Sequence, residues 1–229
     1  MIMYKYALLR ALRHRVTLIF SVILPLILIF IQPFWADGMI MGFSFTAIFM
    51  MLGCFMMSHV LLEDKTSGAI QRILSTPTGM FRYMMENLLA AMTPMFTITL
   101  VVTTAGMILY GWTITFTLSL ALAFIVYNLC MISLCFAWYC LFKSQESSQS
   151  SFAFVMTFMA LIGGLFVPVS MFPGILQYLG AVFPTYWVAQ AMVSLLETGW
   201  ELVNYWFSIG ILILLTIAFL LFGGKRRII

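Results

Sequence analysis

The chain has 229 residues, of which 64% are hydrophobic and 8% are charged, and its formal net charge is +4. A soluble domain has about 25% charged residues, so this composition excludes a soluble globular protein and predicts one membrane domain without a soluble domain. The basic residues lie beside the ends of apolar segments rather than in one stripe, so we expect no nucleic-acid partner.

The eleven Lys and Arg residues predict the topology. They form four clusters: Lys5, Arg10, Arg13 and Arg15; Lys65, Arg72 and Arg82; Lys143; and Lys225, Arg226 and Arg227. Cytoplasmic loops of membrane proteins collect Lys and Arg, so both termini and two internal loops are expected in the cytosol. The opposite side keeps only the acidic residues Asp37, Glu197 and Glu201.

Residues 1–15 are predicted to form an amphipathic helix on the cytoplasmic interface, with a plain basic tail as the alternative. Six spans of about 20 apolar residues are expected. They cover about residues 16–35, 40–62, 84–110, 114–142, 150–167 and 205–222. The first apolar run is too long for a signal peptide and is interpreted as a retained span. Pro25 and Pro94 are expected to kink the first and third spans.

Residues 168–200 are apolar, but helix-breaking residues interrupt them. The breakers are Pro168, Pro173, Gly174, Gly180 and Pro184. A continuous helix does not tolerate this spacing, so we predict two short helices folded into the outer leaflet, neither of which crosses the membrane.

Residues 63–83 are the most polar internal stretch. The apolar residues Ala69, Ile70, Ile73 and Leu74 follow helical spacing after a break at Gly68. Thr76-Pro77 has the pattern of a helix start, with Thr as N-cap and Pro at the first position. The stretch therefore predicts a short cytoplasmic helix, which either docks a soluble partner or lies on the lipid headgroups.

No catalytic or metal-binding constellation is expected. The four cysteines, Cys54, Cys130, Cys135 and Cys140, lie in predicted spans and are interpreted as small apolar fillers. The chain has no P-loop, so we expect no nucleotide site of its own. Glu86 follows Arg82 by four residues, which favours an ion pair within one helix.

Two segments resemble the type-2 ABC transporter permeases, the membrane subunits of bacterial drug, peptide and polysaccharide exporters. The first is E-x4-G-x3-R-x4-P, with Glu63, Gly68, Arg72 and Pro77 in order. The second is residues 168–192, where Pro173, Gly180, Pro184 and Trp187 resemble the re-entrant hairpin that precedes the last span of this family.

The resemblance implies an all-α membrane protein: one permease domain over residues 1–229, with six transmembrane helices, an N-terminal interface helix, a cytoplasmic coupling helix over 63–77 and an extracellular re-entrant hairpin over 168–200. It implies a bacterial plasma-membrane location. The ATPase contact would include the following residues: Glu63, Gly68, Ile70, Arg72, Ile73, Leu74 and Pro77. Pro173, Gly180, Pro184 and Trp187 would belong to the extracellular gate.

The implied partners are two copies of an ABC ATPase, which would hold the ATP and Mg²⁺, a second permease that is identical or paralogous, and membrane lipid. The implied activity is export of an amphipathic or hydrophobic substrate from the drug, peptide, lipid or glycan classes. Substrate-binding residues are not identified, although the 19 methionines suit either an adaptable cavity or helix packing. The alternatives are a non-transporting immunity or sensory subunit, and an ion-coupled secondary transporter, which would need intramembrane ionisable residues that the predicted spans lack or an internal repeat that the sequence does not show.

Overall fold

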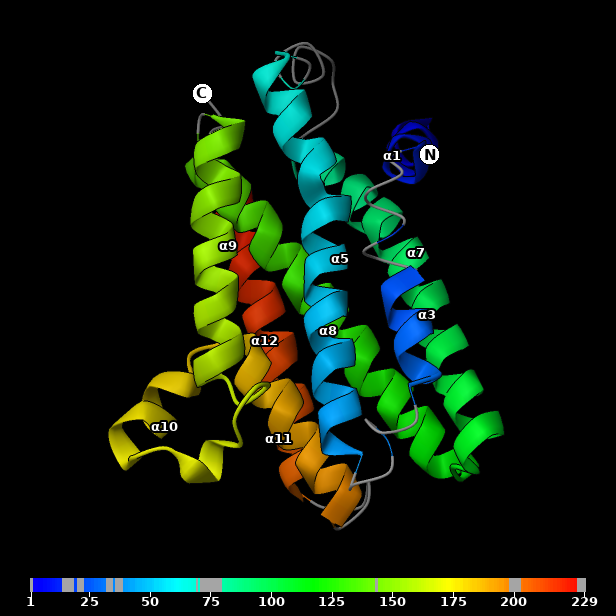
Figure 1. Cartoon of the computed structure of the whole chain (residues 1–229). Helices are drawn as coiled ribbons and strands as arrows, with labels where there is room; N and C mark the ends of the chain where they lie inside the picture. Colours follow the sequence, from blue (N-terminus) through cyan, green and yellow to red (C-terminus); the bar gives the residue numbers. More distant parts are fainter. Residues whose placement is uncertain are drawn as a thin grey trace.

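The computed structural model describes residues 2–13, 19, 23–31, 35, 39–68, 70, 80–142, 144–197 and 203–225. Over these ranges the chain is helical apart from turns and short connections, and no strand is present. The long helices run side by side as a bundle, α1 (Ile2–Arg13) lies across one end, and α10 (Gly174–Gly180) projects at the other end (Figure 1).

Five helices make up most of the bundle. They are α5 (Ile40–Thr66), α7 (Met80–Tyr110), α8 (Ile114–Leu141), α9 (Gln145–Ile162) and α12 (Val203–Lys225). Polar N-caps begin two of them: the Thr113 hydroxyl accepts a hydrogen bond from the Phe116 amide, and the Ser144 hydroxyl accepts one from the Ser147 amide. These caps satisfy amide groups that the first turn leaves without a helical partner.

Helix α8 is the centre of the fold and packs against α5, α7, α11 (Pro184–Glu197) and α12. Its buried Asn128 binds two neighbours, because the side-chain amide donates to Thr99 Oγ1 at 3.1 Å and the oxygen accepts from Cys54 Sγ at 3.5 Å. A buried polar group in a lipid-facing bundle must be satisfied by protein. The network therefore fixes the register of α5, α7 and α8.

Aromatic side chains close the bundle end opposite α1. The indole of Trp35 stacks on the Tyr110 ring at 5.6 Å and lies 5.6 Å from the Trp112 indole. Gly42 makes room for it, because a Cβ at that position would lie 2.7 Å from the Trp35 ring. Gly42 therefore allows the Trp35 side chain to pack directly against the backbone of α5.

The first predicted span is described only in part. Helix α3 (Leu24–Ile29) lies inside it and ends at Phe30, and Ile23, directly before it, is also helical. Whether Pro25 kinks a longer helix depends on residues that are not described, so the predicted kink stays a prediction. The remaining part of the predicted span, residues 16–18, 20–22 and 32–34, lies outside the described residues.

The predicted count of six spans is not confirmed. Among the described residues, four helices are long and apolar enough to cross a membrane: Ile40–Thr66, Arg82–Tyr110, Ile114–Leu141 and Val203–Gly223. A fifth is reached only if α10 and α11, which are bent by 103° at their junction, are taken together as one span. Helix α9 begins with the polar run Gln145–Ser151, which lowers its hydropathy.

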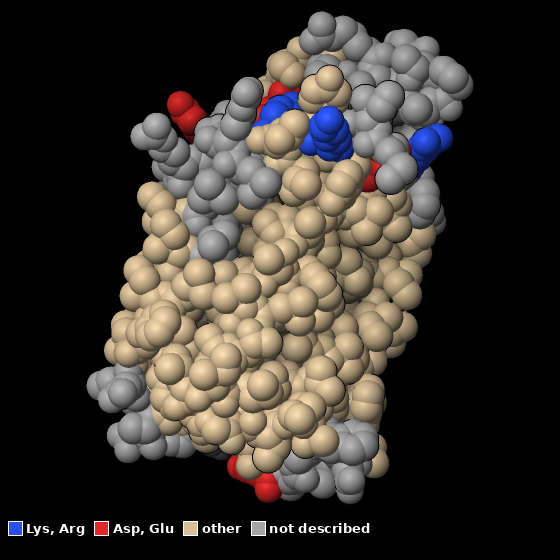
Figure 2. Space-filling model, turned by 90° about the vertical axis from the view of Figure 1, so that its right-hand side faces the viewer, with Lys and Arg blue, Asp and Glu red and all other residues tan. Residues whose placement is uncertain are grey.

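Charged side chains lie at the ends of the molecule. In Figure 2 the basic side chains gather at one end, and an uncharged band separates them from an acidic group at the other end. The end that holds α1 also holds the last turn of α5, the first turn of α7 and the last turn of α12 (Figure 1). This distribution is typical of a membrane protein whose apolar band faces lipid.

Candidate functional site

The last turn of α5 carries three consecutive charged residues, Glu63, Asp64 and Lys65, at the start of the predicted coupling segment. Successive residues of a helix point about 100° apart, so the three side chains reach different neighbours. The helix ends at Thr66, Ser67 caps it, and Gly68 follows with φ +70°. This left-handed conformation favours glycine and turns the chain away from the helix axis.

Asp64 joins three helices. Its side chain is almost fully buried, and its carboxylate accepts hydrogen bonds from Arg10 of α1 at 2.6 and 3.1 Å and from the Tyr83 hydroxyl of α7 at 2.6 Å. A buried carboxylate is stable only when such partners replace water. The hydrogen bond to Asp64 raises the pKa of the Arg10 guanidinium above its ordinary value, against the opposite effect of its partial burial.

Lys65 caps a fourth helix. Its ammonium group donates to the carbonyl oxygens of Tyr139, Cys140 and Phe142 at 3.4, 3.2 and 2.8 Å. These carbonyls lie at the C-terminal end of α8, where the helix leaves acceptors without partners and the macrodipole is negative. Lys65 therefore ties the end of α5 to the end of the central helix.

His59 and Glu63 connect α5 to α9. The two side chains lie 3.3 Å apart, one turn from each other, and the other ring nitrogen of His59 lies 3.2 Å from the Gln149 amide nitrogen of α9. The final two turns of α5 thus contact α1, α7, α8 and α9 through polar groups. A displacement of this helix end would be transmitted to all four neighbours.

The predicted coupling residues have different outcomes. Glu63 and Gly68 lie at the end of α5 as described, and Glu63 belongs to the long helix rather than to a separate short one. Ile70 is 1% exposed and packs in the hydrophobic core. Its side chain therefore contacts the chain itself and is not available on the surface. Arg72, Ile73, Leu74 and Pro77 lie outside the described residues.

The interhelix contacts at Asp64 were not predicted from the sequence. The predicted pairing of Arg82 with Glu86 is confirmed at 3.2 Å. Glu86 also accepts a hydrogen bond from the Tyr4 amide of α1 at 3.3 Å. A usable signal for the missed contacts was an acid in the last turn of one helix and a tyrosine in the first turn of the next.

The breaker-rich segment forms separate short helices. Pro173 precedes α10 and Pro184 begins α11, after a 3-10 turn over Val169–Met171. At Gly180 a Cβ would lie 2.8 Å from the Ile162 carbonyl oxygen, so only glycine allows this close approach to the end of α9. The Trp187 indole donates to the Ala181 carbonyl at 2.7 Å and fixes the bend.

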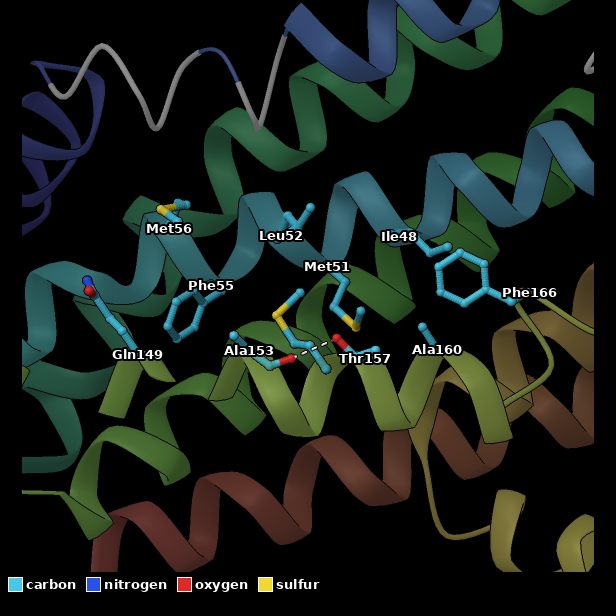
Figure 3. A pocket seen from close by; sticks show the side chains of 11 residues that line it. Ile48, Met51, Leu52, Phe55, Met56, Gln149, Ala153, Thr157, Ala160 and Phe166 are labelled. Atoms are coloured by element: carbon cyan, nitrogen blue, oxygen red, sulfur yellow. Dashed lines mark hydrogen bonds between the residues drawn. The ribbon is translucent and has the colours of Figure 1, made fainter. Parts of the chain in front are cut away.

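A groove of about 410 Å³ lies between α5 and α9 (Figure 3). Its walls are apolar and rich in methionine and phenylalanine. They comprise Ile48, Met51, Leu52, Phe55 and Met56 from α5, Gln149, Ala153, Met156, Thr157 and Ala160 from α9, and Phe166 beyond it. The Thr157 hydroxyl donates to the Ala153 carbonyl at 3.0 Å, which leaves the middle of the groove without a free donor and suits it to apolar surface.

Metal binding has no candidate in the described part of the chain, where no group of three or more His, Cys, Asp or Glu is placed to hold an ion. Cys54, Cys130 and Cys135 are buried, and Cys140 is partly exposed. Their environment is the helix core that contains Asn128 and Ser133, and the buried cysteines act there as packing residues.

The family model described as ABC-2 family transporter protein matches residues 35–225. The chain belongs to this family. The match covers the helices from the aromatic cluster at Trp35 to the end of α12, including the charged end of α5 and the short helices α10 and α11. No curated protein matches the chain. An ABC-2 permease is a multi-pass membrane component of an ABC transporter, which implies association with an ABC ATPase.

Proposed function

We propose that the chain is the membrane subunit of an ATP-driven exporter, located in a bacterial plasma membrane with both termini in the cytosol. Two ATPase subunits would bind the ATP and Mg²⁺, and a second permease, identical or paralogous, would complete the transporter. The basic end of the molecule would face the cytosol, as the positive-inside rule requires. In this arrangement α1 lies on the cytoplasmic interface, and the predicted spans over about 16–35 and 150–167 would complete six crossings together with the four long apolar helices.

The observation that carries this proposal is the polar clamp at the end of α5. Asp64 holds α1 and α7, and Lys65 holds α8. A segment that binds an ATPase needs a stiff connection to the bundle, because a flexible connection would absorb the movement. The proposed coupling segment, 63–77, begins at this clamp: Ile70 packs against the chain itself, and Ile73 and Leu74 would contact the ATPase, with Glu63 and Arg72 at the rim.

The groove between α5 and α9 is the proposed substrate path. Its methionine side chains are flexible and polarisable, so they adapt to substrates of different shape. The apolar lining favours a hydrophobic or amphipathic substrate over a sugar or an ion. Helix α9 also exposes the stacked rings of Phe154 and Phe158, which supports placing the second permease beside this face. Helices α10 and α11 would close the path on the extracellular side.

The coupling contact is tested by ATPase pull-down from detergent-solubilised membranes. The apolar face that the coupling segment would present to the ATPase, Ile73 and Leu74, is small, and at about 25 cal/mol per Å² its burial contributes only a few kcal/mol. Ile73→Asp is therefore expected to abolish co-purification of the ATPase while the chain still inserts. Arg72→Ala should have a smaller effect, because a rim charge contributes under about 1 kcal/mol.

Ser147→Asp is the matched control, because it adds the same charge at an exposed position in the first turn of α9 and should keep full docking. If Ile73→Asp binds the ATPase and supports transport like the unmodified chain, the segment is a membrane-surface helix and the partner docks elsewhere. If the unmodified chain binds the ATPase but the complex moves no substrate in any screen, a sensory or immunity subunit is favoured.

A further inference from the structure

A second apolar groove lies on the other side of the bundle from the proposed substrate path. It has a volume of about 290 Å³ and is bounded by α1, α3 and α7. Its lining residues are Leu8, Leu26, Thr93, Pro94, Thr97, Ile98 and Val101. Pro94 lies inside α7, where it has no amide hydrogen to donate to the carbonyl one turn before it. The groove lies beside this position.

The two hydroxyl groups in the described lining of the groove are engaged by their own helix. The Thr93 hydroxyl donates to the Leu89 carbonyl at 2.8 Å, and the Thr97 hydroxyl donates to the Thr93 carbonyl at 3.0 Å. The other described lining residues carry hydrocarbon side chains. A groove of this kind on the side of a membrane helix presents a surface that suits an acyl chain.

A basic residue of α1 lies one turn before Leu8, which lines this groove. Lys5 of α1 is exposed and precedes Leu8 by three residues, so the two side chains lie on the same side of the helix. Hydrogen bonds of 2.8 Å between the Tyr4 hydroxyl and Thr93, and of 3.3 Å from the Tyr4 amide to Glu86, hold this part of α1 against α7. The nearby carboxylate of Glu86 is already paired with Arg82 at 3.2 Å, and no ion pair of Lys5 occurs among the described residues.

We propose that an anionic phospholipid binds here, with one acyl chain in the groove around Pro94 and its phosphate at Lys5. The apolar groove and the cation lie in the order that a cytoplasmic-leaflet lipid presents them, chain towards the membrane centre and phosphate at the interface. A bound lipid would fill space between α1 and α7. Since Arg10 of α1 holds Asp64, the lipid would also stabilise the position of the α5 end.

The binding test uses native mass spectrometry of the purified full chain, titrated with dioleoyl phosphatidylglycerol and, separately, with dioleoyl phosphatidylcholine. Thr97→Trp fills the groove from an exposed position, and Thr104→Trp, two turns further along α7 and also exposed, is the matched control. We expect Thr97→Trp to weaken the tightest phosphatidylglycerol binding at least tenfold, and Thr104→Trp to leave it unchanged.

The headgroup contact is tested with Lys5→Ala and Lys5→Arg. A basic residue near anionic lipid contributes about 1 kcal/mol, which corresponds to about a fivefold change in affinity. We expect Lys5→Ala to weaken phosphatidylglycerol binding by this factor, Lys5→Arg to restore it, and phosphatidylcholine binding to respond to neither.

Two outcomes overturn the proposal. If Thr97→Trp binds phosphatidylglycerol like the unmodified chain, no acyl chain occupies the groove, whatever Lys5 does. If Lys5→Ala weakens phosphatidylglycerol and phosphatidylcholine equally, the site does not recognise an anionic headgroup. Size-exclusion profiles and thermal unfolding of each variant test whether the protein remains folded. If Thr97→Trp unfolds, Lys5→Ala and Lys5→Arg still test the proposal.

Discussion

Loss of Arg10 should destabilise the protein through the carboxylate that it leaves behind. Arg10→Ala removes two of the three hydrogen bonds to Asp64. Breaking a fully buried ion pair costs about 3–5 kcal/mol, whereas an exposed pair contributes under about 1 kcal/mol. The Arg10 side chain is 44% exposed and that of Asp64 is 4% exposed, so water compensates part of the loss. We therefore expect a cost of about 2 kcal/mol.

The assay is thermal unfolding of the purified protein in one detergent at fixed salt. For a chain of this length each kcal/mol lowers Tm by about 2–4 °C, so Arg10→Ala should lower it by about 4–8 °C. Tyr83→Phe removes the remaining donor and should cost about 1–2 kcal/mol. Arg82→Ala is the control, because Arg82 is 67% exposed and Glu86 keeps its hydrogen bond from the Tyr4 amide, so its cost should stay below about 0.5 kcal/mol.

A double-mutant cycle isolates the pair. Arg10→Ala with Asp64→Ala should cost less than the sum of the single changes, by about 1–2 kcal/mol, because the double variant leaves no buried charge without a partner. Additive effects, or an Arg10→Ala variant as stable as the Arg82→Ala control, would refute the claim that Asp64 is held by Arg10. The same variants, assayed for transport with the ATPase bound, report whether the clamp carries the movement.

Three further predictions concern the hairpin, the end of α8 and the topology. Gly180→Ala should destabilise the protein by about 1–3 kcal/mol in thermal unfolding, because its Cβ would lie 2.8 Å from a backbone oxygen, whereas Gly174→Ala, with open space at its Cβ, should be neutral. Lys65→Met should cost about 1 kcal/mol, because three carbonyls lose a charged donor; an unchanged Tm would show that water replaces it. A single cysteine at Ser67, in a chain without its native cysteines, should resist an impermeant thiol reagent in intact cells, and labelling there would place this end outside.

Sequence patterns were sufficient to predict most of the helices and which end of the molecule carries the basic residues. The apolar runs around α5, α7, α8 and α12 are long enough to predict helices directly, and polar or glycine-containing connections mark their ends. Prolines and glycines between residues 168 and 184 predicted short helices in place of one long span, and α10 and α11 follow these breaks. These features depend on local chemistry, so neighbouring residues were sufficient to predict them.

Contacts between distant residues were decided only by the tertiary structure. Arg10 and Asp64 are 54 residues apart, and Lys65 binds carbonyls 74 or more residues away. In the sequence these residues differ in no way from other charges beside span ends, which are topology determinants by default. Because α1 packs across the bundle end, Arg10 reaches the carboxylate of Asp64, which Tyr83 of α7 also contacts. The burial of this carboxylate makes the ion pair important for stability, and burial cannot be predicted from a local sequence pattern.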